Sequence, residues 1–535
     1  MKRKTYLVSD RYLEHISFTQ IRIEQVELGD LSTLDLETTG LRFNYHSIIF
    51  VIVGTKETQY VIDYNFVDVE KLKILLSRPI IYLGHNLSFD LPFLIERGFN
   101  FNTGQVYDSM ETELTLVKGT MHSVSLQNTL KRRLGVDDLD KGITMEFTRM
   151  SPTNPHFEDR HIEYAYKDVL HLEDLREEQL RIITKLNQNQ VVRVNNEMVV
   201  VVSYMKVTGM PLNKDKWMDL YYANLKRCDE LEIELDGELN KLGLVQKARL
   251  KIRYIQTDLL GGGTDVVNVN KNHINYASPD QIKDIFSHFN QPIPKVNKKV
   301  NGKQVEKDTT GTKELEDYLL SRPKSILKGF LEVLIQYRVY SKRVSTYGKS
   351  FLEEHLTSKG RVHPDFKINR TATGRMSSNN PNAQNIPALK EFRECFEVVG
   401  TDSMFTCDLS SAELRILASL ADDKVLKGLY ENGEDLHSYL ATPAFRYLKD
   451  DPTFVVSKKQ NSELRTLMKT VNFGIAYGAS ASKVGKVLNV SKQKAERVLE
   501  IMKLTIPATF KFLEKQEWTG QNIGIVKFDN VWNQV

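Results

Sequence analysis

The sequence predicts an α/β domain at the N-terminus, followed by a mostly helical region and an α+β region. Three apolar runs are typical of strands, and helical segments follow them, which is α/β patterning. The predicted strands cover residues 31–36, 48–53 and 79–86, and predicted helices cover 90–98 and much of 161–186. Because 535 residues are too many for one compact core, we expect several domains.

Polar residues at 187–190 indicate the end of the first domain. The helical region that follows is interrupted by a glycine-rich loop at 261–265 and by a polar segment at 295–312, which we expect to be mobile. A turn-rich stretch then leads to a predicted strand at 404–408 and several helices. We therefore expect three domains, at 1–186, 191–359 and 360–535.

The composition is ordinary for a globular protein, with 41% hydrophobic and 27% charged residues. No apolar run approaches the roughly 18 residues of a membrane helix, and the basic N-terminus lacks the apolar core of a secretion signal. The three cysteines, Cys228, Cys395 and Cys407, form no CxxC pair, which argues against disulfides and zinc. The sequence thus predicts a cytoplasmic protein without a membrane partner.

The net charge of +4 is small, but its distribution is uneven. Residues 291–350 hold 13 Lys/Arg against 6 Asp/Glu. A basic stripe of this kind is typical of contact with a phosphate backbone, although many charge runs are only solvated faces.

Three short acidic segments indicate a metal site near the N-terminus. Asp35 and Glu37 are two residues apart on a predicted strand, so both carboxylates face the same side. Asp90 lies four residues after Asn86, and Asp168 lies four residues after Tyr164. Neighbouring carboxylates are costly without a cation, and oxygen ligands suit Mg²⁺ or Mn²⁺. The alternatives are a helix-capping Asp90 and a structural Tyr164.

A second pattern lies far downstream, where Arg465, Lys469, Phe473 and Tyr477 recur every four residues. On a helix these side chains share one face. Cations neutralise phosphate oxygens and an aromatic ring stacks on a nucleobase, so the face suits a nucleoside triphosphate. The alternative is an ordinary amphipathic helix whose lysine stem covers apolar surface.

The N-terminal acidic segments, with a Tyr four residues before the last Asp, resemble the DEDDy-type 3′–5′ exonuclease. The resemblance implies a ribonuclease H-like fold. It also implies that two Mg²⁺ (or Mn²⁺) ions are held by Asp35, Glu37, Asp90 and Asp168. Tyr164 would then orient the attacking water.

The downstream pattern resembles the fingers helix of family A (polymerase I-like) DNA polymerases, Arg-xxx-Lys-xxx-aromatic-xxx-Tyr-Gly. The stretches TATGRMSSNNPNAQNIP at 371–387 and CDLSSAELRILASL at 407–420 resemble that family's primer–template motif and first palm motif. The resemblance implies a helical thumb followed by palm and fingers. In it Arg465 and Lys469 bind the triphosphate, with Lys469 also catalytic.

The same resemblance assigns Phe473 to the incoming base and Tyr477 to a pivot at the template side. It implies that Asp408 binds two Mg²⁺ ions, that Glu413 lies under the incoming sugar, and that His437 lies near the triphosphate. The implied DNA contacts are Arg338, Lys342, Arg343, Arg375 and Asn385.

The chain departs from the family pattern after the fingers helix. Only 57 residues follow Gly478, and the family's second palm motif, His-Asp-Glu, is not among them. Asp529 is the only Asp in this stretch and lacks the flanking His and Glu. We therefore expect an incomplete palm, which a C-terminal polymerase fragment would complete.

The leading hypothesis is a phage-like DNA-directed DNA polymerase with 3′–5′ proofreading, acting on primer–template DNA and dNTPs in the cytosol of an infected host or in an organelle. One alternative is a 3′–5′ exonuclease whose second half only holds primer–template. Another is a nucleic-acid-binding remnant without activity.

Overall fold

The computed structural model describes residues 4–118, 120, 122–137, 142–244, 274–300, 303–371, 373–398, 403–523, 526–527 and 533–534. The loop predicted at 261–265 and Asp529 lie outside these residues. The chain divides into two compact units, one of residues 1–90, 100–199 and 405–535 and another of residues 91–99 and 200–404. The three-domain division stays a prediction.

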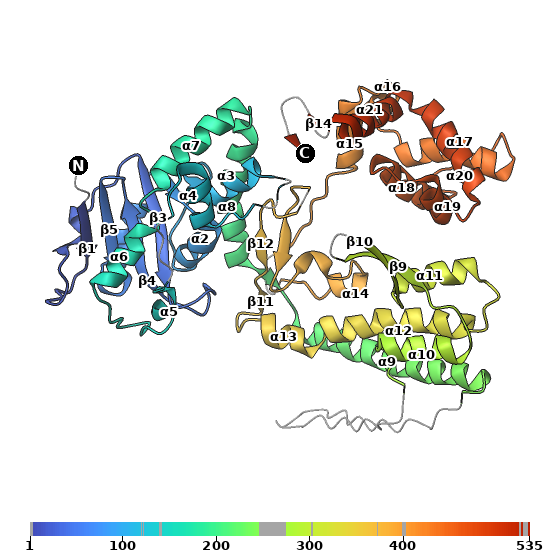
Figure 1. Cartoon of the computed structure of the whole chain (residues 1–535), viewed down its shortest axis with the longest axis horizontal. Helices are drawn as coiled ribbons and strands as arrows, with labels where there is room; N and C mark the ends of the chain where they lie inside the picture. The colour runs from blue at the N-terminus through green and yellow to red at the C-terminus, as the bar shows by residue number, and fades with distance from the viewer. Residues whose placement is uncertain are drawn as a thin grey trace. The chain divides into compact units, whose positions relative to one another are not determined.

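A seven-stranded mixed sheet organises the N-terminal part, coloured blue in Figure 1. The strand order is β2-β1-β5-β4-β3-β6-β7, with β4 antiparallel to both of its neighbours and the other pairs parallel. The strands are β1 (Lys4–Val8), β2 (Thr19–Ile21), β3 (Leu31–Thr38), β4 (Ile48–Gly54), β5 (Thr58–Asp63), β6 (Ile81–Gly84) and β7 (Val106–Asp108).

The central strands form where the sequence predicts them because their apolar runs are covered on both faces. Every residue of β4 is buried, which explains its uninterrupted apolar run. The predicted strands at 31–36 and 48–53 are confirmed, and the third, predicted at 79–86, is shorter. Within the sheet, β3 lies between β4 and β6 and pairs with both.

Helices cover this sheet (Figure 1): one packs on β4 and β5, and another packs on β6. The first is α6 (Asp159–Lys167) and the second is α7 (Leu172–Lys185), which also contacts α3 (Ser109–Leu116) and α4 (Leu126–Leu134). The remaining helices here are α1 (Val69–Leu76), α2 (Leu87–Glu96), α5 (Thr144–Phe147) and α8 (Asn189–Thr208). Because α8 begins at Asn189, the polar stretch at 187–190 is partly helical and does not form a flexible linker.

The unit containing residues 200–404 is mostly helical, as predicted. Its core lies between α9 (Lys214–Lys241) and α12 (Lys328–Thr346), which pack along each other in Figure 1. The other helices are α10 (Pro279–His288), α11 (Thr312–Ser321), α13 (Lys349–His355) and α14 (Lys390–Arg393). Short strand pairs join β8 (Met210–Pro211) to β11 (Arg361–Val362) and β12 (Asp365–Lys367) to β13 (Ser377–Asn379).

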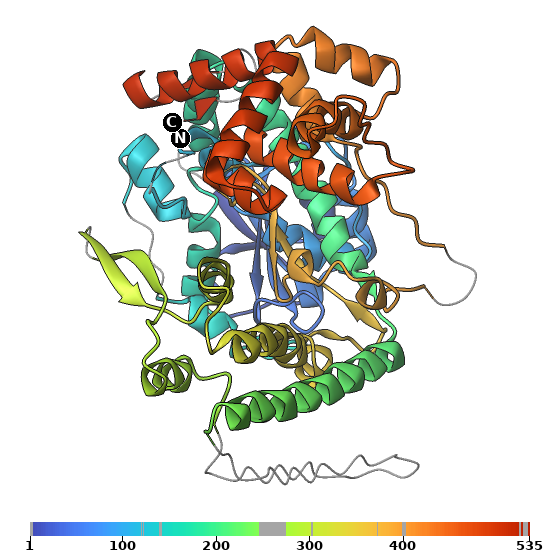
Figure 2. The same ribbon diagram turned by 90° about the vertical axis from the view of Figure 1, so that its right-hand side faces the viewer.

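The polar segment at 295–312 is not a simple mobile interruption. It forms an antiparallel hairpin of β9 (Lys295–Val300) and β10 (Lys303–Asp308), yellow-green in Figure 2. Six residue pairs are in register, so the backbone hydrogen bonds of the ladder offset the low hydrophobicity of the segment.

Residues 405–523 fold into a helical bundle, orange to red in Figure 2. Its helices are α15 (Ala412–Leu420), α16 (Lys424–Glu431), α17 (Leu436–Lys449), α18 (Ser462–Ala476), α19 (Ala481–Leu488), α20 (Lys492–Thr505) and α21 (Pro507–Ile523). Two short strands follow, β14 (Val526–Lys527) and β15 (Asn533–Gln534).

The strand predicted at 404–408 is wrong. Residues 403–409 have no regular secondary structure and are exposed, and no described segment pairs with them. A strand needs a partner for its backbone N–H and C=O groups, so the apolar pattern alone does not produce one here. As a separate finding, no helix in the described ranges combines the length and apolar character needed to cross a bilayer.

Candidate active site

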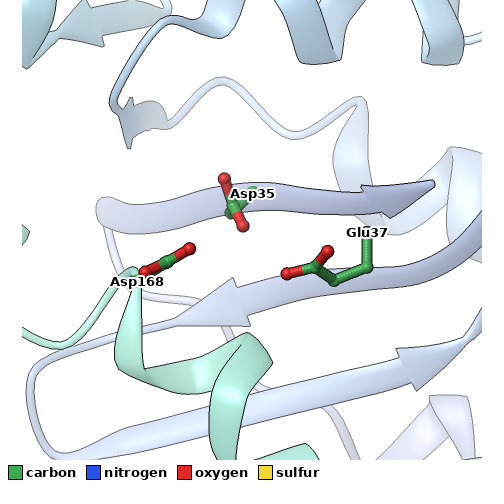
Figure 3. A group of neighbouring side chains, drawn as sticks. All are labelled: Asp35, Glu37 and Asp168. Carbon is green, nitrogen blue, oxygen red and sulfur yellow. The ribbon is translucent and has the colours of Figure 1, made fainter. Parts of the chain in front are cut away.

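Three carboxyl groups from distant parts of the sequence lie together beside β3. Asp35 and Glu37 are two residues apart on this strand, and Asp168 directly follows α6. Each offers an oxygen atom within 4.8 Å of oxygens from the other two. Figure 3 shows the three groups turned toward one another. The structure thus brings together three of the four predicted N-terminal metal ligands.

Burial and repulsion by neighbouring carboxylates dominate the electrostatics of Asp35 and Glu37. Burial raises the pKa of Asp35 well above its usual value, and the carboxylates of Asp90, Asp168 and Glu37 raise it further. Burial also raises the pKa of Glu37, with added contributions from Asp168 and Asp90. Buried like charges are costly unless a cation neutralises them, and an all-oxygen donor set fits a hard divalent ion. These residues therefore fit Mg²⁺ or Mn²⁺.

Asp90, the fourth predicted ligand, lies next to this group without belonging to it. Its Oδ1 accepts a hydrogen bond from the backbone N–H of Leu36 at 3.1 Å, and its charge raises the pKa of Asp35. Because α2 begins at Leu87, Asp90 lies within the first turn of the helix and is not its N-cap. The predicted start of this helix at residue 90 is therefore wrong by three residues.

The earlier start of α2 has its cause in Asp108, a residue that the sequence analysis missed. Its fully buried carboxylate accepts hydrogen bonds from the backbone N–H groups of Leu87 at 2.7 Å and Asn86 at 3.1 Å. It also caps α3 through Met110 and Glu111, at 2.9 and 3.1 Å. One side chain therefore fixes two helix starts. An Asp directly before a helical stretch was the only signal in the sequence.

Tyr164 lies on α6, one turn before Asp168. It is buried, and its hydroxyl group is 2.8 Å from Thr144 Oγ1. Burial and the nearby charges of Asp168, Glu37 and Asp35 raise its pKa, so the phenol stays protonated at neutral pH. A neutral hydroxyl beside the carboxylates can donate a hydrogen bond to a water molecule.

The predicted cationic–aromatic helix is confirmed as α18, with Tyr477 at its C-terminal cap. Lys469 and Tyr477 are exposed, whereas Arg465 and Phe473 are half-buried. The ring of Phe473 lies 6.1 Å from that of His437, between centroids, so α17 contributes to the same site. Arg465, Lys469 and Phe473 thus lie near His437, and Tyr477 is at the end of the same helix.

Arg465 has a partner that the sequence analysis missed. The carboxylate of Asp435 accepts hydrogen bonds from its Nε at 2.5 Å and its Nη2 at 2.7 Å. This pairing holds the pKa of Asp435 well below its usual value. Asp435 occupies the N-cap position of α17 without making a capping hydrogen bond. Its sequence position therefore suggests a cap, while its carboxylate orients a cation.

The predicted palm residues are less organised. Asp408 is exposed in the irregular segment before α15, and within the described residues it joins no group of three metal-ligating side chains. Glu413 lies in the first turn of α15 and is also exposed. The structure therefore does not assemble a metal site at Asp408.

The predicted DNA contacts lie in the unit of residues 200–404. Arg338 donates hydrogen bonds to the backbone oxygen and hydroxyl of Thr310, and Arg343 lies 4.7 Å from the ring of Tyr340. Lys342 is exposed and, with Arg338, lines a cavity of about 560 Å³. Exposed Arg375 and Asn385 lie elsewhere, before β13 and in a short 3₁₀ helix.

Two protein-family models match the chain. The model for DNA polymerase family A matches residues 254–528, which is just over half of the chain. The model for a 3′–5′ exonuclease matches residues 22–183, the region that contains Asp35, Glu37 and Asp168.

Curated relatives are bacterial enzymes named DNA polymerase I. The protein from Borreliella burgdorferi is 27% identical over 94% of this chain, and the chain spans 51% of its length. The protein from Aquifex aeolicus is 27% identical over 89% of the chain, which spans 75% of its length. The POL domain of Pol1 from M. smegmatis, solved with a DNA primer–template and dNTP, has a similar fold, with a TM-score of 0.68 at 18% identity. That similarity covers 94% of this chain and 77% of the other.

Proposed function

Because the chain belongs to DNA polymerase family A and carries a 3′–5′ exonuclease domain, we propose that it removes nucleotides from DNA 3′ ends and binds primer–template with dNTPs for primer extension. The observation that carries the exonuclease activity is the group of Asp35, Glu37 and Asp168, whose oxygen atoms lie within 4.8 Å of one another. The chain spans about half the length of one curated relative. The activity and substrates of this chain are therefore proposals.

The exonuclease chemistry follows from the residues beside β3. Asp35, Glu37 and Asp168 would hold Mg²⁺ or Mn²⁺, and the resemblance to the DEDDy-type exonuclease adds Asp90, whose charge acts on Asp35. Divalent ions bound here supply charge neutralisation for the scissile phosphodiester and its leaving oxygen. Tyr164, kept protonated by its surroundings, donates a hydrogen bond that orients the attacking water.

The nucleotide site follows from α18. Arg465 and Lys469 neutralise phosphate oxygens, Phe473 stacks on the incoming base, and Tyr477 closes the template side. Asp435 holds one edge of the Arg465 guanidinium, so its other N–H groups point in a defined direction. Lys342, Arg375 and Asn385 are exposed enough to meet a DNA backbone.

A second candidate function is exonuclease activity alone, with the polymerase half only holding primer–template. Asp408 is exposed and belongs to no group of three metal-ligating side chains among the described residues, and both observations favour this function. The need for a C-terminal fragment and a phage source stay predictions from the sequence. We also place the protein in a reducing cytosol, which is consistent with its three free cysteines.

A 5′-labelled primer–template with Mg²⁺ tests the proposal, with and without dNTPs. We expect shortening of the primer without dNTPs and extension with them. Shortening under both conditions would support the exonuclease-only function, and binding without either would contradict both activities. Adding a polymerase fragment that carries the His-Asp-Glu motif then decides whether extension needs a second chain.

A further inference from the structure

A buried pair of polar side chains lies directly behind the proposed nucleotide-binding face of α18. His437 is on α17 and Asn472 is on α18, and each is only 4% exposed. The side-chain nitrogen of Asn472 lies 3.0 Å from Nδ1 of His437. Asn472 immediately precedes Phe473, whose ring flanks that of His437. The pair thus links two helices at the point where the nucleotide is proposed to bind.

The chemistry of this contact fixes where the imidazole proton lies. With the Asn472 amide nitrogen facing Nδ1 of His437, the amide donates and Nδ1 accepts, so the single ring proton of the neutral form is on Nε2. An imidazolium carries a proton on both nitrogens, which would set two donors against each other. The contact is therefore compatible only with the neutral ring.

The charged groups around His437 act in the same direction. Burial, together with Arg465 and Lys469 on α18, lowers the pKa of His437 to about 4, and Asp435 opposes this only in part. The ring therefore does not titrate between pH 6 and pH 8. A neutral His437 can donate a directed hydrogen bond to an anion, and it does not repel the neighbouring cations Arg465 and Lys469.

We propose that Asn472 is a positioning residue that holds His437 as a neutral Nε2–H donor toward the phosphates of a nucleoside triphosphate bound along α18. The inference rests on the proposed function for its ligand, but the hydrogen bond itself can be measured without nucleotide. The side chains on this face then have separate roles. Arg465 and Lys469 supply positive charge to the triphosphate. His437 supplies one directed hydrogen bond and stays uncharged between pH 6 and pH 8.

The first test is spectroscopic and uses the full chain with ¹⁵N-labelled histidine. The His437→Gln variant identifies the His437 signals among the 12 histidines. We expect the Nε2–H tautomer at pH 7 and no protonation above pH 5. Asn472→Asp places an acceptor at Nδ1, so we expect an Nδ1-protonated ring whose midpoint rises by about two to three pH units, into the range between pH 6 and pH 8.

Two further variants separate this role from a general effect on the fold. Asn472→Leu keeps the volume but removes the donor, so the fixed tautomer should be lost. Thr470→Asp adds the same charge to an exposed position of α18 and should leave the His437 signals unchanged. An Nδ1–H tautomer in the unaltered chain, or an unchanged midpoint in Asn472→Asp, would overturn the inference.

The second test measures dNTP affinity on a primer–template with a dideoxy-terminated primer, so that no bond forms. We expect Asn472→Asp to lose roughly 10-fold more affinity than the unaltered chain between pH 6 and pH 8, because only its His437 titrates in that range. If the dNTP affinity of both proteins depended equally on pH, the proposed hydrogen bond from His437 to the phosphates would be overturned. Failure of the unaltered chain to bind any dNTP would instead overturn the proposed function, even with the expected tautomer.

Discussion

The charge of Asp35 opposes stability in the absence of a cation, because the residue is half-buried and the carboxylates of Asp90, Asp168 and Glu37 repel it. We predict that Asp35→Asn abolishes Mg²⁺-dependent shortening of a primer while stabilising the metal-free N-terminal sheet by roughly 1–3 kcal/mol at pH 8. Hydrogen exchange of β3 amides in EDTA measures the stability, and a primer assay measures the activity. Asp30→Asn, at an exposed position just before β3, is the control. A variant that is both inactive and less stable would favour a structural Asp35.

Asp63, at the end of β5, gives a pH dependence with a definite sign. Burial raises its pKa to about 6, and the Arg11 guanidinium, whose Nε donates to it at 3.1 Å, only partly offsets this. A raised pKa means that the contribution of Asp63 to stability is complete below about pH 4 and is lost as the pH rises through 6. We predict that Asp63→Asn removes a pH-dependent loss of roughly 3 kcal/mol between pH 4 and pH 7. Hydrogen exchange of β5 amides at pH 4 and pH 7 measures the change in the free energy of unfolding. The same change in the unaltered chain and in Asp63→Asn would contradict the prediction.

At the scale of elements, Asp108 joins the start of α2 to the start of α3. We predict that Asp108→Ala destabilises the N-terminal sheet and its helices by roughly 3 kcal/mol or more, because four backbone N–H groups, three of them buried, lose their acceptor. The matched control is Asp68→Ala, an exposed N-cap of α1, which should cost only about 1 kcal/mol. Thermal unfolding compares the two variants. Since α2 carries Asp90, the Mn²⁺ affinity should also fall in Asp108→Ala alone; equal losses in both variants would contradict this role.

The elements also show where sequence patterns suffice and where they fail. The strands at 31–36 and 48–53 and helix α18 were predictable because their own periodicity decides their structure. The strand at 404–408 failed because strand formation depends on a partner that periodicity does not reveal. The hairpin of β9 and β10 was missed because its polar residues gain from pairing with each other rather than from burial.

The candidate site divides in the same way. Asp35, Glu37 and Asp168 were predictable from three acidic segments in a fixed order. Asp35 and Glu37 are two residues apart on a strand, and Asp168 lies one helical turn after a Tyr. Asp435 and Asn472 were missed because their roles depend on contacts with side chains some 30 residues away in the sequence, at Arg465 and His437. An Asp at an N-cap position and an Asn before an aromatic residue are common in sequences, so neither indicates a functional contact.

At the scale of the whole molecule, the two proposed chemistries need opposite charges. The N-terminal sheet gathers buried carboxylates that require a cation, whereas α18 and α17 present cations and a neutral donor that suit an anion. The net charge of +4 hides this division. Because no residue is assigned to both sites, substitutions should separate the two activities completely.

We therefore predict that Asp35→Asn and Lys469→Ala have exclusive effects. Asp35→Asn should lose primer shortening and keep dNTP-dependent retention of a dideoxy-terminated primer–template. Lys469→Ala should keep shortening and weaken that retention by roughly 10-fold, the typical effect of removing one hydrogen bond to a charged group. Lys459→Ala removes an exposed cation just before α18 and controls for net charge. If either substitution impaired both activities in a protein with unchanged thermal unfolding, the two sites would have to be coupled.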